Sequence, residues 1–169
     1  QKGDHDSEHG ALWIWKTPIT GRDYILCADT GNGGGDASDY SAFHVIDTYD
    51  MEQVAEFYSN TIPTFQYVQI LSKIGMSYNH ALLVMERNSN ITALDLLEKQ
   101  LMYDNLYIKK NGGKWMAGFH TNNSSRAVIC EKLQIALTLN KIKIHSIRVL
   151  TEMDIWIYNS AKRRPEAEK

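Results

Sequence analysis

Four segments with the composition of β-strands follow one another before the first helical segment of this 169-residue chain. They span residues 11–18, 22–30, 40–48 and 52–60, and each is rich in aromatic or β-branched residues. Strands this close in sequence, with no helix between them, are expected to pair as an antiparallel meander. A purely parallel, doubly wound fold would not begin in this way, so the expected sheet is mixed.

The rest of the chain alternates between helical and strand patterns. The short apolar run over 81–87 is typical of a central strand that is buried on both faces. Thr64 is expected to cap the first helix, and Thr92 with Asp95 to form a capping box at the second. The other segments predict a helix over 64–78, a helix over 90–103, a hairpin over 106–120, a helix from Ser124 or Ser125 to 139, a strand over 142–145 and a helix over 147–158. The expected fold class is α/β, a mixed β-sheet flanked by helices.

The composition predicts a globular domain without a strong charge bias. Hydrophobic residues make up 43% and charged residues 22% of the chain, and the formal net charge is −2. A domain that binds nucleic acid usually carries a basic face, although clustered carboxylates would lower the total charge. Cys27 and Cys130 form no CxxC pair, which indicates a reducing, intracellular compartment. With no signal peptide and no apolar run of membrane-spanning length, no membrane partner is expected.

Two acidic residues stand where hydrophobic strands are expected to end. Asp29 is followed at once by a glycine-rich loop, and Glu86 precedes the second helical segment. The ends of strands are where α/β sheets bind ligands. If the two strands are neighbours in the sheet, the two carboxylates lie close together at such an end. Two like charges in one site raise a pKa or recruit a cation, and oxygen-only ligands favour Mg²⁺ or Mn²⁺. Each acid alone has a structural explanation, a turn cap for Asp29 and, for Glu86, an ion pair with Arg87 or another cation at the surface, but the combination favours a metal site.

The glycine-rich loop that follows Asp29 does not fit either phosphate-binding motif. A dinucleotide fingerprint needs a third glycine where Asp36 stands, and the next segment is a strand rather than a helix. The P-loop motif of nucleotide-binding motors occurs nowhere in the chain. Asp36 and Asp39 add acids near Asp29, and Asp39 is either a further metal ligand or part of a surface turn.

A small basic cluster surrounds the turn of the expected hairpin. Lys109, Lys110 and Lys114 lie there beside Trp115, and Arg126 follows at the start of the next helix. These residues are either the solvated surface of a hairpin and a helix start, or contacts to a nucleic-acid backbone.

Three sequence blocks follow one another in the chain: ILCADTGNGGGDASDYSAFHVID, LLVMERNSN and AGFHTNNSSR. In this order and at these intervals they resemble the nuclease domain of the large terminase subunit of tailed bacteriophages, within a similarity that runs from about Asp23 to the C-terminus. The resemblance implies a ribonuclease H-like fold and a metal-dependent endonuclease that cuts concatemeric double-stranded DNA with two Mg²⁺ or Mn²⁺ ions. It places the catalytic carboxylates on Asp29 and Glu86 and an auxiliary metal ligand on Asp39.

The same resemblance implies a setting and partners for the domain. An ATPase domain precedes it in the parent chain, and the portal protein and the small terminase subunit assemble with it in the cytoplasm of the host cell. Double-stranded DNA is the substrate, and Lys109, Lys110, Lys114 and Arg126 become the expected DNA contacts.

The C-terminal end departs from the family pattern. In the family, a His-Asp-Asp element that supplies the remaining metal ligand follows a helix like residues 151–160, whereas this sequence ends at 163–169. We therefore expect residues 1–20 to be a leader and the first strand, and 21–169 to be a nuclease domain truncated at its C-terminus. The third acid is then missing, or is supplied by Asp36, Asp39 or Asp154.

Two alternative functions remain open from the sequence. One is another ribonuclease H-like nuclease, such as a resolvase or transposase core. The other is a domain that binds DNA or the packaging motor and that does not cut DNA in this form.

Overall fold

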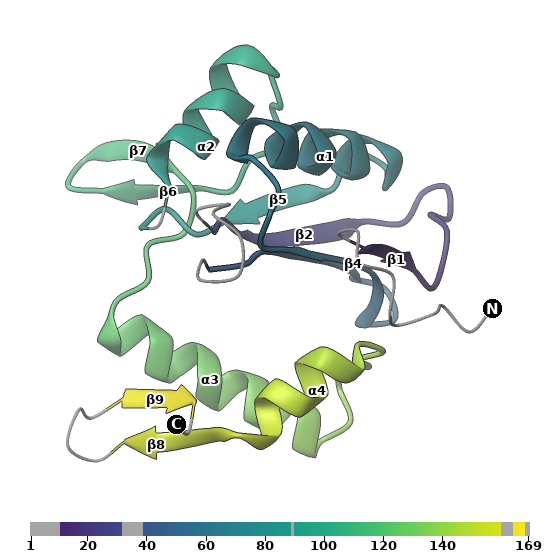
Figure 1. The fold of residues 1–169 in the computed structure, drawn as a ribbon, viewed down its shortest axis with the longest axis vertical. Coiled ribbons are helices and arrows are strands. Elements are labelled where there is room, and N and C mark those ends of the chain that lie inside the picture. The colour runs from purple at the N-terminus through teal and green to yellow at the C-terminus, as the bar shows by residue number, and fades with distance from the viewer. Residues whose placement is uncertain (1–10, 32–38, 89, 160–163, 168–169) are drawn as a thin grey trace.

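The computed structural model of the chain describes residues 11–31, 39–88, 90–159 and 164–167. Five strands form the central sheet in the order β1-β4-β3-β2-β5 (Figure 1). They are β1 (Ala11–Ile14), β2 (Tyr24–Asp29), β3 (Ser41–Asp47), β4 (Glu52–Ser59) and β5 (Leu82–Met85). β5 is parallel to β2, whereas the other neighbours are antiparallel. The expected mixed sheet is therefore confirmed.

The antiparallel meander comprises β2, β3 and β4, but not β1. A meander of all four strands would place β1 beside β2, and this prediction is wrong because β5 occupies that edge of β2. β1 instead crosses to the far edge of the sheet and pairs with β4. The connection is fixed against the end of the first helix, where the hydroxyl of Tyr78 donates to the carbonyl of Lys16 at 2.7 Å.

One face of the sheet carries the hydrophobic core. It is covered by α1 (Thr64–Ser77), α2 (Ile91–Asp95) and a π-helical segment, η1 (Leu96–Gln100) (Figure 1). Large side chains with no more than 3% of their surface exposed fill this layer: Leu26, Phe43, Val45, Phe57, Tyr67, Val68, Leu71, Leu83, Met85, Leu94 and Leu97. The strand at 81–87 was expected to be buried on both faces, but the buried residues Ala81, Leu83 and Met85 share one face, while Leu82 and Val84 on the other face are half-buried.

The helices begin at other residues than the sequence suggested. α1 has Pro63 at its N-cap without a side-chain hydrogen bond, so Thr64 is the first helical residue and not the cap. The side chain of Asn90 caps α2 by accepting from the backbone N–H of Ala93, so no Thr92–Asp95 capping box forms. The physical reason is that an Asx side chain just before the first turn reaches the free N–H groups of that turn.

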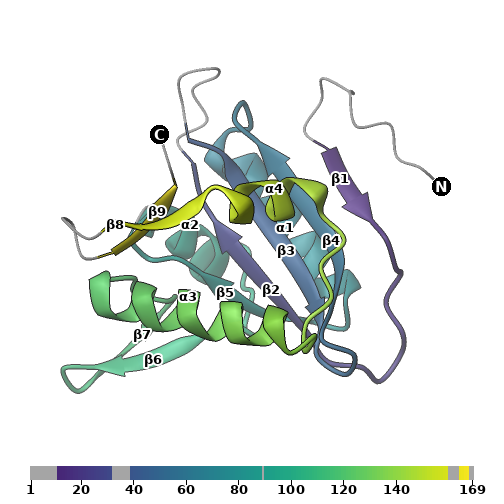
Figure 2. The ribbon, with the colours of Figure 1, turned by 90° about the horizontal axis from the view of Figure 1, so that it is seen from below.

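A second layer lies on the opposite side of the sheet. It consists of α3 (Asn123–Thr138), α4 (Ile147–Asp154) and a small hairpin of β8 (Trp156–Asn159) and β9 (Arg164–Ala167). This layer lies below the sheet in Figure 1, and in Figure 2, which is the view from below, α3 and α4 lie in front of the strands. The helix expected over 147–158 ends at Asp154, because the Trp-Ile-Tyr sequence that follows favours the β8 strand. The strand expected over 142–145 is only a single bridge between Lys143 and Glu52.

A third element, the hairpin of β6 (Ile108–Asn111) and β7 (Lys114–Ala117), forms as expected. Its turn uses Gly112 and Gly113, both with positive φ, a conformation that favours glycine. Within the described ranges, no helix is both long and apolar enough to cross a membrane.

Candidate active site

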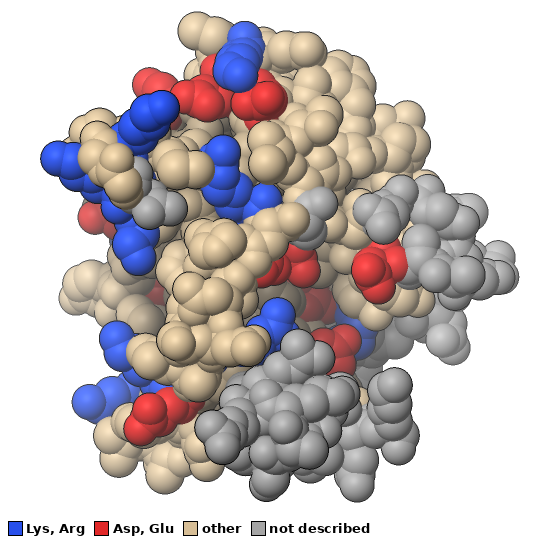
Figure 3. All heavy atoms as spheres, turned by 90° about the vertical axis from the view of Figure 1, so that its left-hand side faces the viewer, with Lys and Arg blue, Asp and Glu red and all other residues tan. Residues whose placement is uncertain are grey.

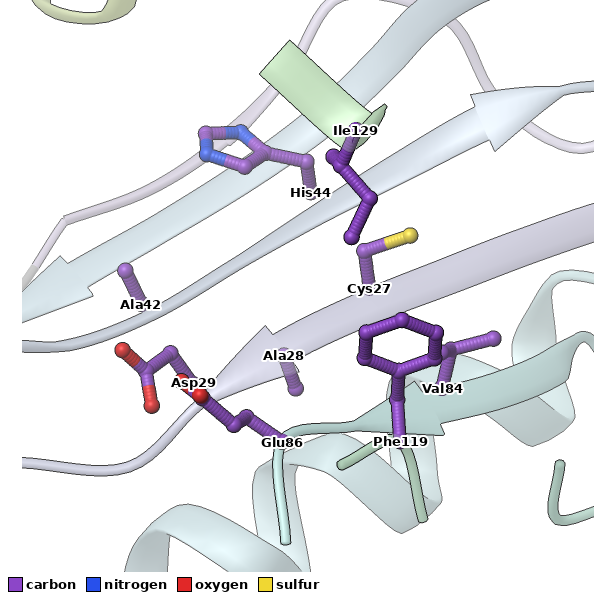
Figure 4. Close-up of a pocket in the computed structure, with 9 residues that line it drawn as sticks. All are labelled: Cys27, Ala28, Asp29, Ala42, His44, Val84, Glu86, Phe119 and Ile129. Carbon is purple, nitrogen blue, oxygen red and sulfur yellow. The ribbon is translucent and has the colours of Figure 1, made fainter. Parts of the chain in front are cut away.

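The side of the molecule that carries the β6–β7 hairpin is hollowed. Figure 3 shows acidic side chains set back near the middle of this face, with Lys and Arg side chains gathered toward the hairpin. The hollow contains a recess of about 450 Å³ at the ends of β2 and β5, on the face of the sheet opposite α1 and α2. Its lining comprises Cys27, Ala28, Asp29, Ala42, His44, Val84, Glu86, Phe119 and Ile129 (Figure 4).

Asp29 and Glu86 meet in this recess as the sequence predicted. Asp29 is the last residue of β2, and Glu86 follows β5 directly. In the parallel pairing of these strands Ala28 is opposite Met85, and the N–H of Glu86 donates to the carbonyl of Ala28 at 3.1 Å. Neighbouring positions on parallel strands point to the same face, and Figure 4 shows the two carboxylates side by side.

The backbone around Asp29 is held by buried hydrogen bonds. The hydroxyl of Tyr67, a fully buried residue of α1, donates to the carbonyls of Asp29 at 2.9 Å and Ala42 at 2.5 Å. Burial, and to a lesser extent the charge of Asp29, holds the pKa of Tyr67 well above its ordinary value, so the hydroxyl remains a donor. Asp29 Oδ1 also accepts from the backbone N–H of Thr30 at 2.8 Å. The end of β2 is therefore fixed in place from within the core.

Glu86 is held from the other side by the segment that follows the hairpin. Phe119 forms a bridge with Glu86, its N–H donates to the carbonyl of Met85, and its carbonyl accepts from the N–H of Arg87, both at 2.8 Å. The guanidinium of Arg87 donates to the carbonyl of Ala117 at 2.9 Å, so Arg87 is occupied by the backbone and does not pair with Glu86.

Asp39 lies at the neck of the glycine-rich loop rather than in the recess. A side chain at Gly31 would collide with the backbone of Asp39 and Tyr40, which explains why the strand that ends at Asp29 continues into a glycine. Asp39 is exposed and does not line the recess. Asp36 falls outside the described residues, and Asp154 is the exposed last residue of α4.

No three His, Cys, Asp or Glu side chains are grouped closely enough to hold a metal ion anywhere in the described part of the chain. The recess therefore offers two carboxylates as oxygen ligands. Among its other lining residues, Cys27, His44 and Phe119 have polar or aromatic side chains, and the sequence did not predict them as site residues. Cys27 had a usable signal, because it precedes Asp29 by two residues on the same strand and so shares its face.

The expected basic residues surround this side of the molecule without entering the recess. Lys109 and Lys110 on β6 and Lys114 on β7 are exposed. The ammonium of Lys110 lies 6.0 Å from the ring centre of Trp115, which is itself 67% exposed. Arg126 lies in the first turn of α3, three residues before Ile129 of the recess lining.

Neither protein-family models nor curated protein sequences match this chain. Solved structures do match it. The large terminase nuclease of thermophilic phage G20c with bound magnesium superposes with a TM-score of 0.74 at 15% identity, covering 96% of this chain and 79% of that one. The cobalt-bound form of the same nuclease gives 0.73 at 16% identity with the same coverage.

The nuclease domain of the large terminase of Thermus phage P74-26 is also similar. It gives a TM-score of 0.68 at 17% identity, covering 94% of this chain and 76% of that one. At identities this low, the superpositions establish the fold alone, and they do so over nearly the whole chain. The chain therefore has the ribonuclease H-like α/β fold of the nuclease domains of phage large terminases.

Proposed function

We propose that this chain is the metal-dependent endonuclease domain of a phage DNA-packaging terminase, and that it cuts concatemeric double-stranded DNA. The observation that carries the proposal is the meeting of Asp29 and Glu86 in one recess, at the ends of two parallel strands. Two adjacent carboxylates with no cation are mutually repulsive, so this arrangement is costly unless it serves a bound ion. The terminase nuclease fold supports the same conclusion.

The two carboxylates fit a divalent ion such as Mg²⁺ or Mn²⁺. Such ions take oxygen ligands, and Mg²⁺ keeps several waters, so one or two carboxylates suffice to hold it. When bound, two such ions supply a deprotonated water and stabilise the charge that develops on the phosphate. Asp29 and Glu86 would hold the metal, and the exposed Asp39, whose backbone lies beside Gly31 at the neck of the glycine-rich loop, would be an auxiliary ligand.

The chain's own residues have separate tasks in this mechanism. Tyr67 fixes the carbonyl end of β2, and Phe119 fixes the backbone of Glu86, so that both carboxylates keep their relative positions. Lys109, Lys110 and Lys114, together with Arg126, would contact the DNA backbone outside the recess. The strand ends thus position the carboxylates, while the basic residues of the hairpin and of α3 supply the positive charge for the DNA backbone.

The wider setting is part of the same proposal. The domain would act with an ATPase domain of the same parent chain, with the portal protein and with the small terminase subunit, in the host cytoplasm. Its supports are the terminase nuclease fold and the three sequence blocks.

Cleavage of a supercoiled plasmid in Mg²⁺ or Mn²⁺ tests the proposal. Since two carboxylates hold an ion loosely, we expect slow nicking and then linearisation with the protein in excess over DNA. Asp29→Asn and Glu86→Gln should abolish cutting and leave salt-sensitive DNA binding intact, because the lysines and not the carboxylates meet the backbone.

The matched control is Glu98→Gln, which removes an exposed carboxylate from η1 on the other side of the sheet. It should cut as the unaltered chain does. Equal cutting by the Asp29 and Glu86 variants would contradict the proposal, as would no metal-dependent cutting by the unaltered chain.

A further inference from the structure

The side-chain amide of Gln53, on β4, has an orientation that its neighbours determine. Gln53 is 1% exposed, and its Oε1 accepts from the backbone N–H groups of His145 and Ser146, both at 2.9 Å. Because a backbone N–H can only donate, the oxygen must face these two residues. The NH₂ group therefore faces the other way, where it donates to Nδ1 of His44 at 2.8 Å.

This hydrogen bond fixes the tautomer of His44. Nδ1 has to present a lone pair to the amide, so the proton of the neutral ring is on Nε2. The Oε2 atom of Glu56 is 3.7 Å from Nδ1, too far for a competing hydrogen bond, and Glu56 Oε1 is bound to Arg148 at 2.7 Å. Burial, with a contribution from the charge of Arg148, lowers the pKa of His44, although the charge of Glu56 opposes this shift. The lowered pKa favours the neutral ring.

His44 lines the recess, and its Nε2–H group faces into it. Cys27 pairs with His44 and Asp29 with Ala42 across β2 and β3, so His44 and Asp29 are diagonal neighbours on one face. Such neighbours lie roughly 7–8 Å apart, a separation that one phosphate group can span. Figure 4 shows the ring turned toward the Ala42 and Asp29 side, and no acceptor for Nε2 occurs among the described residues.

The fixed tautomer excludes two other roles for His44. A metal ligand or a general base needs a free lone pair on the ring, but Nδ1 is occupied by Gln53 and Nε2 carries the proton. The remaining capacity is that of a neutral donor. In a recess lined by apolar groups such as Val84 and Phe119, a hydrogen bond to an anion is stronger than in water.

We propose that His44 donates a hydrogen bond from Nε2 to a phosphate oxygen of DNA bound in the recess with Asp29 and Glu86. The proposal rests on the nuclease function above and adds a substrate contact from β3. Because the donor is neutral, it attracts the phosphate without competing with the metal for the carboxylates. Gln53 is then a positioning residue that acts through His44.

Nuclear magnetic resonance of the ¹⁵N-histidine-labelled chain tests the donor directly. We expect His44 at pH 7 to carry its proton on Nε2, and the Nε2–H signal to shift on addition of inorganic phosphate or of a short DNA duplex with Ca²⁺. The signal is assigned by its loss in His44→Gln. A proton on Nδ1, a doubly protonated ring, or an Nε2–H signal that neither probe shifts would overturn the proposal.

Single-turnover cleavage tests the contribution of the contact. His44→Leu removes the donor, whereas His44→Gln keeps an amide N–H near the position of Nε2. A lost hydrogen bond to a charged group predicts a rate about 10- to 100-fold lower for His44→Leu, with most of the rate restored in His44→Gln. DNA affinity should change less than the rate in both variants, because the hairpin lysines supply most of it.

The free energy of unfolding of both variants is measured in parallel, since each alters the partner of Gln53. Equal rate losses in the two variants, or no loss in His44→Leu while Asp29→Asn is inactive, would overturn the role of His44 and leave the nuclease function standing. If the unaltered chain does not cut, the nuclease function fails, and the resonance shift with phosphate still decides whether His44 is an anion donor.

Discussion

The two faces of the central sheet are packed in opposite ways. Toward α1 and α2 the sheet presents Leu26, Phe43 and Phe57, which are at most 3% exposed and meet equally buried residues of the helices. Toward α3 and α4 the buried side chains of the sheet include Glu52, Gln53 and Glu56, and neither helix contributes a described residue that is fully buried. Stability thus comes mainly from one face, while the other is held by directional bonds and remains open enough to contain the recess.

The sheet face toward α3 and α4 is held by a small number of polar contacts near β4. Glu52 accepts from Lys16 at 2.5 Å and from His145 at 2.6 Å, and Arg148 of α4 donates to Glu56 at 2.7 Å. The guanidinium of Arg148 also stacks over Trp13 and Tyr58, 4.3 and 4.5 Å from the ring centres. The bonds from His145 and Arg148 fix α4 to β4, while α3 contributes Ile129 to the lining of the recess that contains Asp29 and Glu86.

The largest effect on the free energy of unfolding should come from a substitution on the apolar face. Leu71→Ala on α1 removes a fully buried side chain and should lower the free energy of unfolding by about 2–5 kcal/mol. The matched change on α3, Ile135→Ala, alters a side chain that is 49% exposed and should cost about 0.5 kcal/mol or less. Urea denaturation measures both, and similar losses would break the contrast between the two faces.

A smaller and pH-dependent effect should come from Glu52, whose side chain is 4% exposed. The hydrogen bond from Lys16, followed by that from His145, lowers the pKa of Glu52 from 4.5 to about 2. A depressed pKa stabilises the fold above the ordinary value of 4.5, and this contribution is lost as the pH falls toward 2. Glu52→Gln should therefore cost about 1–3 kcal/mol at pH 7, and less at low pH.

Urea denaturation at pH 7, 4 and 2.5 checks this prediction. The exposed Glu131 of α3 provides the control, since Glu131→Gln should leave the unfolding free energy within about 0.5 kcal/mol at each pH. A gap between Glu52→Gln and the unaltered chain that stays constant with pH would show that the ion pairs do not hold this layer.

The smallest expected effect is an increase in the stability of the metal-free protein. Asp29→Asn keeps the hydrogen bond from the N–H of Thr30 but removes one of two adjacent negative charges, so the metal-free protein should be unchanged or more stable by up to about 1 kcal/mol. Mg²⁺ should raise the melting temperature of the unaltered chain by binding the folded state, and Asp29→Asn should lose most of that response. Calorimetric scans with the same metal response in both proteins would contradict the proposed ion site.

The residues of the candidate site were predictable where the signal is contiguous in the sequence. Asp29 and Glu86 each end an apolar run, and because β2 and β5 are parallel neighbours their ends coincide. The three strands of the meander were equally readable, since short connections leave few alternatives. The position of β1 could not be predicted, because it depends on which edge of the sheet remains free once β5 has paired.

His44 and Gln53 show what local patterns cannot reveal. Their hydrogen bond joins β3 and β4 next to a register shift between Val45 and Ile46, and the amide is oriented by the backbone of His145, 92 residues away from Gln53. A histidine in an alternating strand has the same sequence signature whether it is an inert surface residue or a fixed donor.

Among the described residues, the outer edge of β5 and of Glu86, which follows it, makes two isolated bridges, Leu83 to Leu106 and Glu86 to Phe119. The chain between them, 107–118, contains the β6–β7 hairpin, and its base is closed by the bond from Gly118 N to Tyr107 O at 2.8 Å. Loop closure becomes only about 0.6 kcal/mol more costly for each doubling of length. In evolutionary terms, the hairpin can therefore lengthen, shorten or change its charges between two fixed points, while Glu86 stays in place beside them.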